Sequence, residues 1–521
     1  MWYGLLALAM LVSCWYALAQ AYRIEEFPQA VDSFGYQHMA QAVREARAAG
    51  TQPVYTFDDP RARELVAALK ASNVPMEKWQ TFVAPQAFHY HPQTDSFIIQ
   101  YPPGVGLALS LFERGKSLWP LNVLQIGTIV GLGLAGLVVT VRRRKPGAGG
   151  AAGVVALATT FALGLIGTSV SYSIDMIAAL LPLSVTLAVL ANGCKRGWVA
   201  VLLATLAGVC FGYGVLCRIA LVFLLPGMIA LLWPTARRAW LTHVAPFLAG
   251  TTLCGIVPLL MHQKRLTGSY FQSTYSQIDA TAPSVANIPN NFANYFLTPE
   301  SFNGNYALFV IALSVACLVA LAVLTQQSRR LLISAAIVFL VPTGYFLIHK
   351  VPTFYYQLPG ILAASVMLVL AALALAKKDV AAPSLRRVYL NVGAYSAGVV
   401  AIGLACMPPM VVTHAAPLEE RVWQVPEPLK DPQAIIYGER FTGTLWHFNR
   451  IAAFDITHTD ADTALLALRH FHAKQRPQYV IYDNNNLKGI LTQLVQRGVA
   501  VEDAGFQLDN RQVLKVKDVP R

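Results

Sequence analysis

The chain is poor in charged residues. Asp, Glu, Lys and Arg together make up 13% of its 521 residues, whereas an ordinary soluble domain has roughly 25%. Hydrophobic residues make up 55%, aromatic residues 10%, and the mean hydropathy is +0.48. This composition nearly excludes a water-soluble enzyme, and it is the reverse of the polar composition that keeps chains disordered. We therefore expect an integral membrane protein.

Cysteine is also scarce, and its placement excludes a disulfide framework. The seven cysteines all fall in or beside apolar stretches, and the two long polar segments, 21–119 and the tail after Thr413, contain none. The cysteines show no zinc-ligand spacing, and the tail after Thr413 contains no Walker loop, dinucleotide fingerprint or internal repeat. The sequence thus predicts no metal or cofactor site of a familiar kind.

Long apolar stretches provide the main structural signal. A helix needs about 17 to 25 apolar residues to cross the roughly 30 Å core of a bilayer. We expect about eleven such helices. They are predicted at 2–20, 120–141, 151–169, 174–191, 198–216, 219–233, 240–262, 306–324, 331–348, 356–376 and 389–411.

The basic residues divide the short connections into two alternating sets. Most of them fall in one set, which the positive-inside rule places in the cytoplasm. This set contains Arg142, Arg143, Arg144, Lys145, Lys195, Arg196, Arg237, Arg238, Arg329, Arg330, Lys377, Lys378, Arg386 and Arg387. With an odd number of spans, the N-terminus is then cytoplasmic, and segments 21–119 and 412–521 lie outside. The net charge of +13 is therefore explained by membrane topology, and we expect no nucleic-acid partner.

The first span has an alternative interpretation as a cleaved leader. Ala17-Leu18-Ala19 resembles a signal-peptidase site, and Leu11-Val12-Ser13-Cys14 resembles a lipoprotein box. Both processing routes require a basic n-region, and residues 1–13 contain no Lys or Arg. We therefore expect a retained helix, and either outcome leaves the following segment outside.

The two exterior segments differ in pattern. Segment 21–119 predicts short helices at 40–49 and 60–71, whereas the tail predicts strands at 434–437, 451–456 and 479–482 and helices at 460–475 and 487–498. The predicted fold class is an α-helical polytopic membrane protein with a small C-terminal extracytoplasmic α/β domain. The predicted domains are 1–411, including the exterior loop 21–119, and 412–521.

A carboxylate follows the first span, in Val31-Asp32-Ser33-Phe34-Gly35-Tyr36. If this piece is helical, Asp32 and Tyr36 stand at i and i+4 and share a face. A carboxylate beside a phenol at the membrane edge could orient and deprotonate an acceptor hydroxyl. The alternative is that Asp32 caps the following helix.

A proline turn closes the exterior loop at Tyr101-Pro102-Pro103-Gly104. Prolines fix the backbone, so this motif predicts a rigid turn at the bilayer surface or, alternatively, a simple interfacial break. Upstream, His89 and His91 would share a strand face. They lack a clear third ligand, so we do not expect a metal there.

Four cations lie on the side that should be poor in positive charge: Arg218, Lys264, Arg265 and Lys350. Each alone could be a snorkelling side chain at the membrane edge. Together they predict a site for an anionic head group, because Lys and Arg are the usual phosphate ligands. On the same side Asp175 would complement the dipole of a helix N-terminus.

A first span, an exterior Asp32 and a closing Tyr101-Pro102-Pro103-Gly104 together resemble the GT-C superfamily of polyprenyl-phosphate-sugar glycosyltransferases. The likeness is to the protein O-mannosyltransferase-like group and the lipid A aminoarabinose transferase, and it covers about residues 1–375. Gly208 to Pro226 and Leu266-Thr267-Gly268-Ser269 resemble further parts of that architecture.

The resemblance implies a fold, a reaction and a site. Asp32 would be the catalytic base with Tyr36 beside it, and Tyr101 would line the same cavity. Ser33 stands where many relatives have Glu, so Asp58, Asp59, Asp95 and Asp175 are all candidates for a second carboxylate. A polyprenyl-phosphate-sugar would donate its sugar, with inversion, to a glycan, lipid or protein hydroxyl. No metal is required, because the leaving phosphate is already charged and cations can stabilise it. The implied location is a bacterial inner membrane with the active site in the periplasm.

Two other function classes fit parts of this pattern. An O-antigen polymerase or ligase also acts on polyprenyl-linked glycans, although it would carry its large loop later in the chain. A secondary transporter would place ionisable residues near the middle of its spans. The predicted spans here are nearly free of charge, which favours an enzyme.

Overall fold

The computed structural model describes residues 2–25, 31–112, 119–143, 155–156, 159, 163, 175–233, 240–275, 283–296, 326–349, 359–360, 362–364, 366–367, 424–439, 441–482, 485–508 and 511–520. The chain divides into two compact units. The first, called here the helical unit, comprises Met1–Ile24, Trp119–Leu259 and Thr281–Val412. The second, called the mixed unit, comprises Glu25–Leu118, Leu260–Ala280 and Thr413–Arg521.

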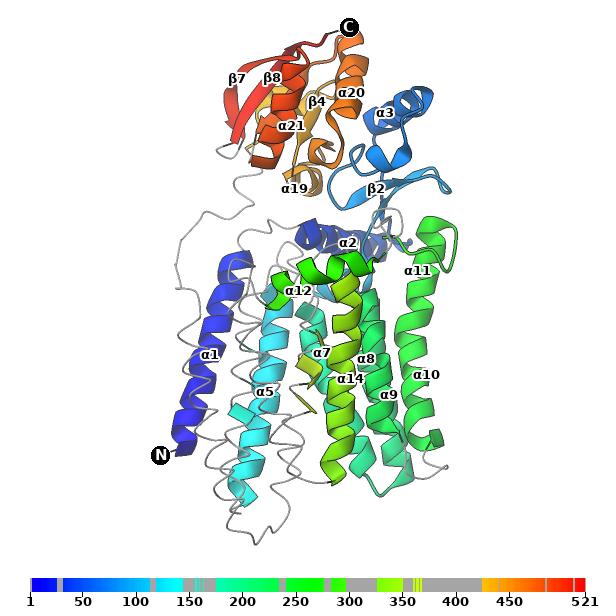
Figure 1. Ribbon diagram of the computed structural model, residues 1–521, viewed down its shortest axis with the longest axis vertical. Coiled ribbons are helices and arrows are strands. Elements are labelled where there is room, and N and C mark those ends of the chain that lie inside the picture. Colours follow the sequence, from blue (N-terminus) through cyan, green and yellow to red (C-terminus); the bar gives the residue numbers. More distant parts are fainter. Residues whose placement is uncertain are drawn as a thin grey trace. The chain divides into compact units, whose positions relative to one another are not determined.

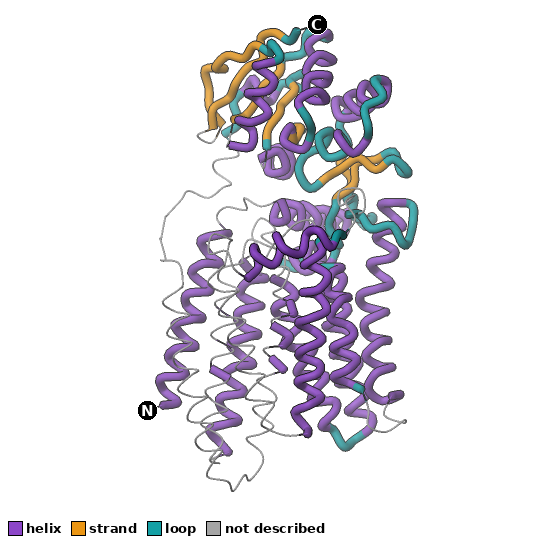
Figure 2. The backbone as a smooth tube through the Cα atoms, viewed as in Figure 1, coloured by secondary structure: helices purple, strands orange, loops and turns teal. Residues whose placement is uncertain are grey.

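The helical unit is a bundle of helices that run side by side (Figure 1). Its described α-helices include α1 (Trp2–Glu25), α5 (Trp119–Arg143), α7 (Asp175–Gly193), α8 (Gly197–Cys217), α9 (Leu225–Leu232), α10 (Ala245–Thr251), α11 (Val257–Thr267, which continues into the mixed unit), α12 (Ile288–Phe296) and α14 (Gln326–Ile348). Short helical segments of other types are η2 (Ile219–Leu224), η3 (Trp240–Val244), η4 (Thr252–Ile256) and η5 (Val285–Asn287). All strands among the described residues belong to the mixed unit, as the orange segments of Figure 2 show.

Three helices in the described part of the chain are long and apolar enough to cross a membrane: Leu121–Val139, Gly197–Cys217 and Trp240–Thr267. Shorter apolar helices cover Gly4–Ala19, Leu180–Gly193, Ile219–Leu232 and Ile333–Ile348. The prediction of about eleven spans is therefore not confirmed. Those predicted at 151–169, 306–324, 356–376 and 389–411 lie wholly or mostly outside the described residues.

Glycines bring α8 and α10 into backbone contact. A Cβ at Gly208 would lie 2.8 Å from the carbonyl carbon of Phe247, and one at Gly212 would lie 2.6 Å from the carbonyl oxygen of Thr251. From the other side, a Cβ at Gly250 would lie 2.9 Å from the amide nitrogen of Val209. Small residues at such a seam allow two apolar helices to pack closely where burial from water gives no driving force.

The C-terminal part of the mixed unit is an α/β domain. Its sheet has the order β5-β4-β6-β8-β7, from β4 (Ile435–Gly438), β5 (Phe454–Asp455), β6 (Gln478–Tyr482), β7 (Ala500–Leu508) and β8 (Arg511–Asp518). Strand β4 pairs in parallel with β5 and β6, and the remaining pairs are antiparallel. The helices are α18 (Glu427–Lys430), α19 (Phe441–Asn449), α20 (Ala461–Ala473) and α21 (Asn485–Gln496), with the turn η7 (Ile456–His458).

The predicted strand at 451–456 is too long. Only Phe454 and Asp455 pair as β5. The chain then turns into η7, because the Asp455 carboxylate accepts a hydrogen bond from the Thr457 amide and caps the turn. The strands near 434–437 and 479–482 and the two predicted helices are confirmed as β4, β6, α20 and α21.

The loop predicted at 21–119 folds into α2 (Val31–Ala49), α3 (Pro60–Ala71), η1 (Met76–Lys78), α4 (Gly104–Leu109) and a small antiparallel sheet of β1 (Thr56–Phe57), β2 (Phe88–His91) and β3 (Ser96–Ile99). Its strand order is β1-β3-β2. The predicted helix at 60–71 coincides with α3, whose first residues carry two start signals, an N-cap Asp59 and Pro60. The predicted helix at 40–49 is the second half of the longer α2.

This loop packs against the C-terminal domain rather than standing alone. One face of its sheet is aromatic, and the Phe57 ring meets those of Phe88, Phe97 and, from α19, Trp446, at centroid distances of 5.9, 5.4 and 4.7 Å. The sequence-based division at 411/412 did not anticipate these contacts, which join residues nearly 400 positions apart.

Candidate active site

Helix α2 carries the predicted carboxylate. Asp32 and Tyr36 both lie within it, so they occupy positions i and i+4 of one helix, as expected if the piece is helical. The side chain of Asp32 lies outside the described residues. The side chain of Tyr36 is 1% exposed, so it lies in the interior of the mixed unit.

Tyr101 of the proline turn covers Tyr36. Their ring centroids are 4.8 Å apart, with the planes tilted by 41°. Gly35 permits this approach, because a Cβ there would lie 2.7 Å from Cδ2 of Tyr101. Pro103 immediately precedes α4, and its backbone is already helical (φ −79°, ψ −11°). The structure therefore brings together two of the residues that the sequence singled out, and it adds Gly35 as the residue that makes room for them.

The end of the long apolar helix, at α11, and the segment that follows it complete the surroundings of Tyr101. His262 Nε2 lies 3.2 Å from the carbonyl oxygen of Tyr101, and the Thr274 hydroxyl donates to the carbonyl of Gln100 at 2.7 Å. The Gln100 amide in turn donates to the Tyr101 phenol at 2.6 Å, and the Tyr275 ring lies 6.2 Å from that of Tyr101. Sequence reasoning missed His262, Thr274 and Tyr275, because no local pattern distinguishes them.

Lys264 and Arg265 stand in the last turn of α11. Arg265 donates to the carbonyl of Pro53 at 2.6 Å, and its guanidinium lies 5.9 Å from the Tyr55 ring centroid. Lys264 donates to the carbonyl of Gly268 at 2.6 Å. Cations at a helix C-terminus satisfy carbonyls and the helix dipole. Both residues are also exposed, so their remaining donors can reach an anion.

The other predicted cations are less well defined. Arg218 belongs to the helical unit, where it ends α8 in an extended conformation and is half-buried. Lys350 lies outside the described residues. Asp175 begins α7, but its side chain is not among those described. A phosphate site made by all four cations thus stays a prediction.

Three candidates for a second carboxylate have local partners. Asp58 pairs with Arg63 at 2.5 Å. Asp59 caps α3 through the Arg61 amide, at 2.8 Å, and pairs with the Arg61 guanidinium. Asp95 accepts a hydrogen bond from Tyr90, which lowers the pKa of the carboxyl, and the positive charge of Lys70 at 3.6 Å acts in the same direction. These contacts give each of the three acidic residues a structural role that does not depend on catalysis.

His89 and His91 lie on one face of β2 and are both fully buried. His91 Nδ1 is 3.2 Å from the Thr94 hydroxyl, which donates to the carbonyl of Leu266. Burial, together with the neighbouring His91, lowers the pKa of His89 to about 3, so its ring is neutral. Within the described ranges, no three His, Cys, Asp or Glu side chains gather as metal ligands would.

Helix α19 of the C-terminal domain packs directly on α2. Any side chain at Gly443 would overlap the ring of Phe34. One turn further along α2, His38 meets His447 with ring centroids 5.9 Å apart. Burial lowers the pKa of His38 to about 4, and the charge of Arg450 adds to this. The contact is therefore tight and formed by a neutral His38.

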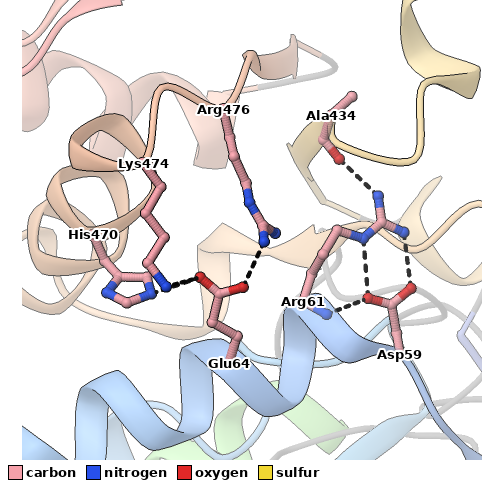
Figure 3. A network of polar contacts seen from close by, with 7 residues as sticks. All are labelled: Asp59, Arg61, Glu64, Ala434, His470, Lys474 and Arg476. Atoms are coloured by element: carbon pink, nitrogen blue, oxygen red, sulfur yellow. Dashed lines mark hydrogen bonds and ion pairs between the residues drawn. The ribbon is translucent and has the colours of Figure 1, made fainter.

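A polar network fastens α3 to α20 (Figure 3). Glu64 accepts from His470 at 2.9 Å and pairs with Lys474 at 2.7 Å and Arg476 at 2.8 Å. Beside it Arg61, held by Asp59, donates to the carbonyl of Ala434 at 2.7 Å. Partial burial alone would raise the pKa of Glu64, but the hydrogen bonds from Lys474 and His470 and the charge of Arg476 lower it below its usual 4.5.

Glu64→Gln should weaken this docking by about 1 to 2 kcal/mol, because three basic side chains lose a shared anion. Hydrogen exchange in α3 and α20 measures the effect. A carboxyl whose pKa is lowered on folding stabilises the folded state fully above pH 4.5, the usual pKa of the group. This contribution is lost as the pH falls through the lowered pKa of the folded state. The difference between wild type and variant should therefore shrink below pH 4.5. Glu77→Gln, at an exposed residue, is the control and should leave hydrogen exchange in α3 and α20 unchanged. A difference between wild type and Glu64→Gln that persists at low pH would contradict the role of the Glu64 carboxylate in this network.

No family model and no curated protein sequence matches this chain. A search of solved structures finds ArnT from Cupriavidus metallidurans bound to undecaprenyl phosphate, with a TM-score of 0.51 and 13% identity over 99% of this chain and 98% of that one. The apo structure of the same ArnT gives a TM-score of 0.45 and 12% identity over 88% and 93% of the two chains. The likeness to the first structure lies at the level of the fold, the one that the GT-C resemblance predicted.

Proposed function

We propose that this protein is a membrane glycosyltransferase that takes a sugar from a polyprenyl-phosphate-linked donor and transfers it to an acceptor hydroxyl. The observation that carries the proposal is the packing of Tyr36 on Tyr101, which joins the Asp32 helix to the proline turn. The shared fold supports it, since the ArnT structure that matches is bound to undecaprenyl phosphate. We place the reaction on the periplasmic face of a bacterial inner membrane, on the basis of the predicted topology.

The reaction would be a single displacement. Asp32, as general base, takes the proton of the acceptor hydroxyl while its oxygen attacks the anomeric carbon. The bond from that carbon to the phosphate oxygen breaks, and polyprenyl phosphate leaves with the bonding electrons. Lys264 and Arg265 would bind the leaving phosphate, because each keeps donors toward solvent at the end of α11. Tyr36 and Tyr101 would fix the position of α2 at the site.

Asp32→Asn should lower turnover by roughly 10²- to 10⁴-fold, because this is the range that a positioned general base contributes. The assay uses purified protein in lipid with a panel of polyprenyl-phosphate sugars and polyprenyl-diphosphate glycans. Glu45→Gln, an exposed acid three turns further along α2, is the matched control and should retain turnover.

Several outcomes would overturn parts of the proposal. Unchanged turnover in the Asp32→Asn protein would remove Asp32 from the mechanism. A product that keeps the donor's anomeric configuration would contradict single displacement. Use of diphosphate donors alone would move the protein to the polymerase or ligase class. Asn variants of Asp58, Asp59, Asp95 and Asp175 in the same assay identify any second carboxylate.

A further inference from the structure

A groove opens between α9 and α14 in the helical unit, and none of the residues proposed above for catalysis is among those that line it. Its volume is about 850 Å³, within the roughly 300 to 1,000 Å³ typical of small-molecule sites. It is lined by Leu225, Pro226, Ile229, Ala230, Trp233, Arg330 and Ile333. The two helices touch beside it at Gly227, where a Cβ would lie 3.0 Å from the amide nitrogen of Val338.

One cation stands in this apolar lining. Arg330 is half-buried in the first turns of α14, and the lining residues that the structure describes include no acidic one. A guanidinium at such a position presents several donors in a planar fork, which matches the oxygens of a phosphate. Among the described lining residues no other side chain is charged, so a small hydrated anion would gain one contact from them and leave the apolar surface uncovered.

Exposed tryptophans indicate where along the bundle the groove lies relative to the membrane surface. Trp233 lies at its edge, 55% exposed, and its ring centroid is 5.6 Å from that of Trp240. Trp198, at the start of α8, is 68% exposed. The start of α8 and the end of α9 lie at the same end of the helical unit (Figure 1). Exposed tryptophans at one end of apolar helices are typical of the membrane–water interface.

We propose that this groove binds an anionic diacyl phospholipid. Its phosphate would pair with Arg330, and one acyl chain would lie along Leu225, Ile229 and Ile333. The apolar walls favour a chain because they would otherwise face water or loosely packed lipid. Arg330 belongs to the basic set that we assign to the cytoplasm, so the lipid comes from that leaflet. The site is independent of the proposed sugar donor, whose phosphate ligands lie at the end of α11.

The test uses the intact protein in detergent micelles, with bromine on the acyl chains of the added lipid as a quencher of tryptophan fluorescence. Trp233→Phe identifies the part of the signal that comes from the groove. Brominated phosphatidylglycerol should quench this part saturably, at about five- to tenfold lower concentration than brominated phosphatidylcholine, since one Arg near the surface contributes about this preference. Arg330→Gln should abolish the preference, and Arg330→Lys should keep most of it.

Arg196→Gln is the control, because Arg196 is an exposed cation at the same end of the bundle, beside Trp198. It should keep the preference. Equal quenching by the two lipids in the wild type, or the same loss in Arg196→Gln as in Arg330→Gln, would overturn the proposal. Competition by inorganic phosphate would indicate a free-anion site instead, and stronger competition by polyprenyl phosphate than by phosphatidylglycerol would assign the groove to that lipid. Both would also overturn the proposal.

Discussion

Gly208→Ala should destabilise the helical unit by about 3 kcal/mol or more, the upper part of the range for overpacking. The added methyl group would meet the backbone of Phe247, and a backbone atom cannot rotate away as a side chain can. The two helices must therefore separate, which also opens the contacts of Gly212 and Gly250 along the same seam. Thermal unfolding of the purified protein in detergent, and the yield of folded protein in membranes, measure the loss.

Gly131→Ala is the matched control. Gly131 lies inside α5, and a Cβ there would meet nothing within 4 Å. In a helix, alanine is favoured over glycine by about 1 kcal/mol, so this variant should be neutral or slightly more stable. The same Gly→Ala substitution should therefore lower the stability at position 208 and leave it unchanged or raise it at position 131. Equal melting temperatures for the two variants would show that α8 and α10 do not pack through glycine.

Gly443→Ala should loosen the C-terminal domain from α2 and slow the proposed reaction. The methyl group would overlap the ring of Phe34, which is 1% exposed and has no free space to enter. We expect a loss of about 1 to 3 kcal/mol, seen as faster hydrogen exchange in α2 and α19. Since α2 carries Asp32, a shift of about 1 Å in this helix could reduce turnover by roughly a hundredfold.

A second substitution separates this cause from a general loss of stability. Phe34→Leu removes the outer ring atoms, so the double variant Gly443→Ala/Phe34→Leu should be less destabilised than the sum of the single variants, by about 1 kcal/mol or more. Gly489→Ala in α21, where a Cβ meets nothing within 4 Å, is the control and should not lose stability. Additive effects of the two substitutions would contradict direct packing of Gly443 on Phe34.

The parts of the fold that could be predicted are those with strong local signals. Helix α3 is predicted to the residue, because Asp59 and Pro60 start it and its apolar residues recur at helical spacing. Helix α20 has the same kind of start, with Asp460 accepting from the Thr463 amide. By contrast, the β7–β8 hairpin escaped prediction. Its strands are half-exposed and rich in polar residues, so their alternation is weak. The pairing of β8 with β6, and of β7 with β8, decides them rather than local preference.

The docking of the loop on the C-terminal domain could not be predicted. Glu64 and its partner His470 are 406 residues apart, and each alone has the pattern of an ordinary charged residue on an exposed helix face. The role of Gly443 could not be predicted either. In the sequence it is only a poor helix former, whereas in the structure the ring of Phe34 packs directly against it. Such contacts leave no trace in local periodicity, because only the folded chain brings their partners together.

In the candidate site, too, the residues could be predicted from the sequence but the contacts between them could not. Asp32, Tyr36 and Tyr101 were singled out because Asp32 and Tyr36 have helical spacing and because the order of these residue types resembles a known family. The contact between Tyr36 and Tyr101, the space left by Gly35 and the support of Tyr101 by His262 required the structure. Composition and the distribution of charge by themselves predicted a membrane protein, and they are the basis for the predicted exterior segments, because the bilayer selects for apolar length and for the side of basic residues. Tertiary structure alone decided which side chains meet, because such contacts depend on close packing between segments that are distant in sequence.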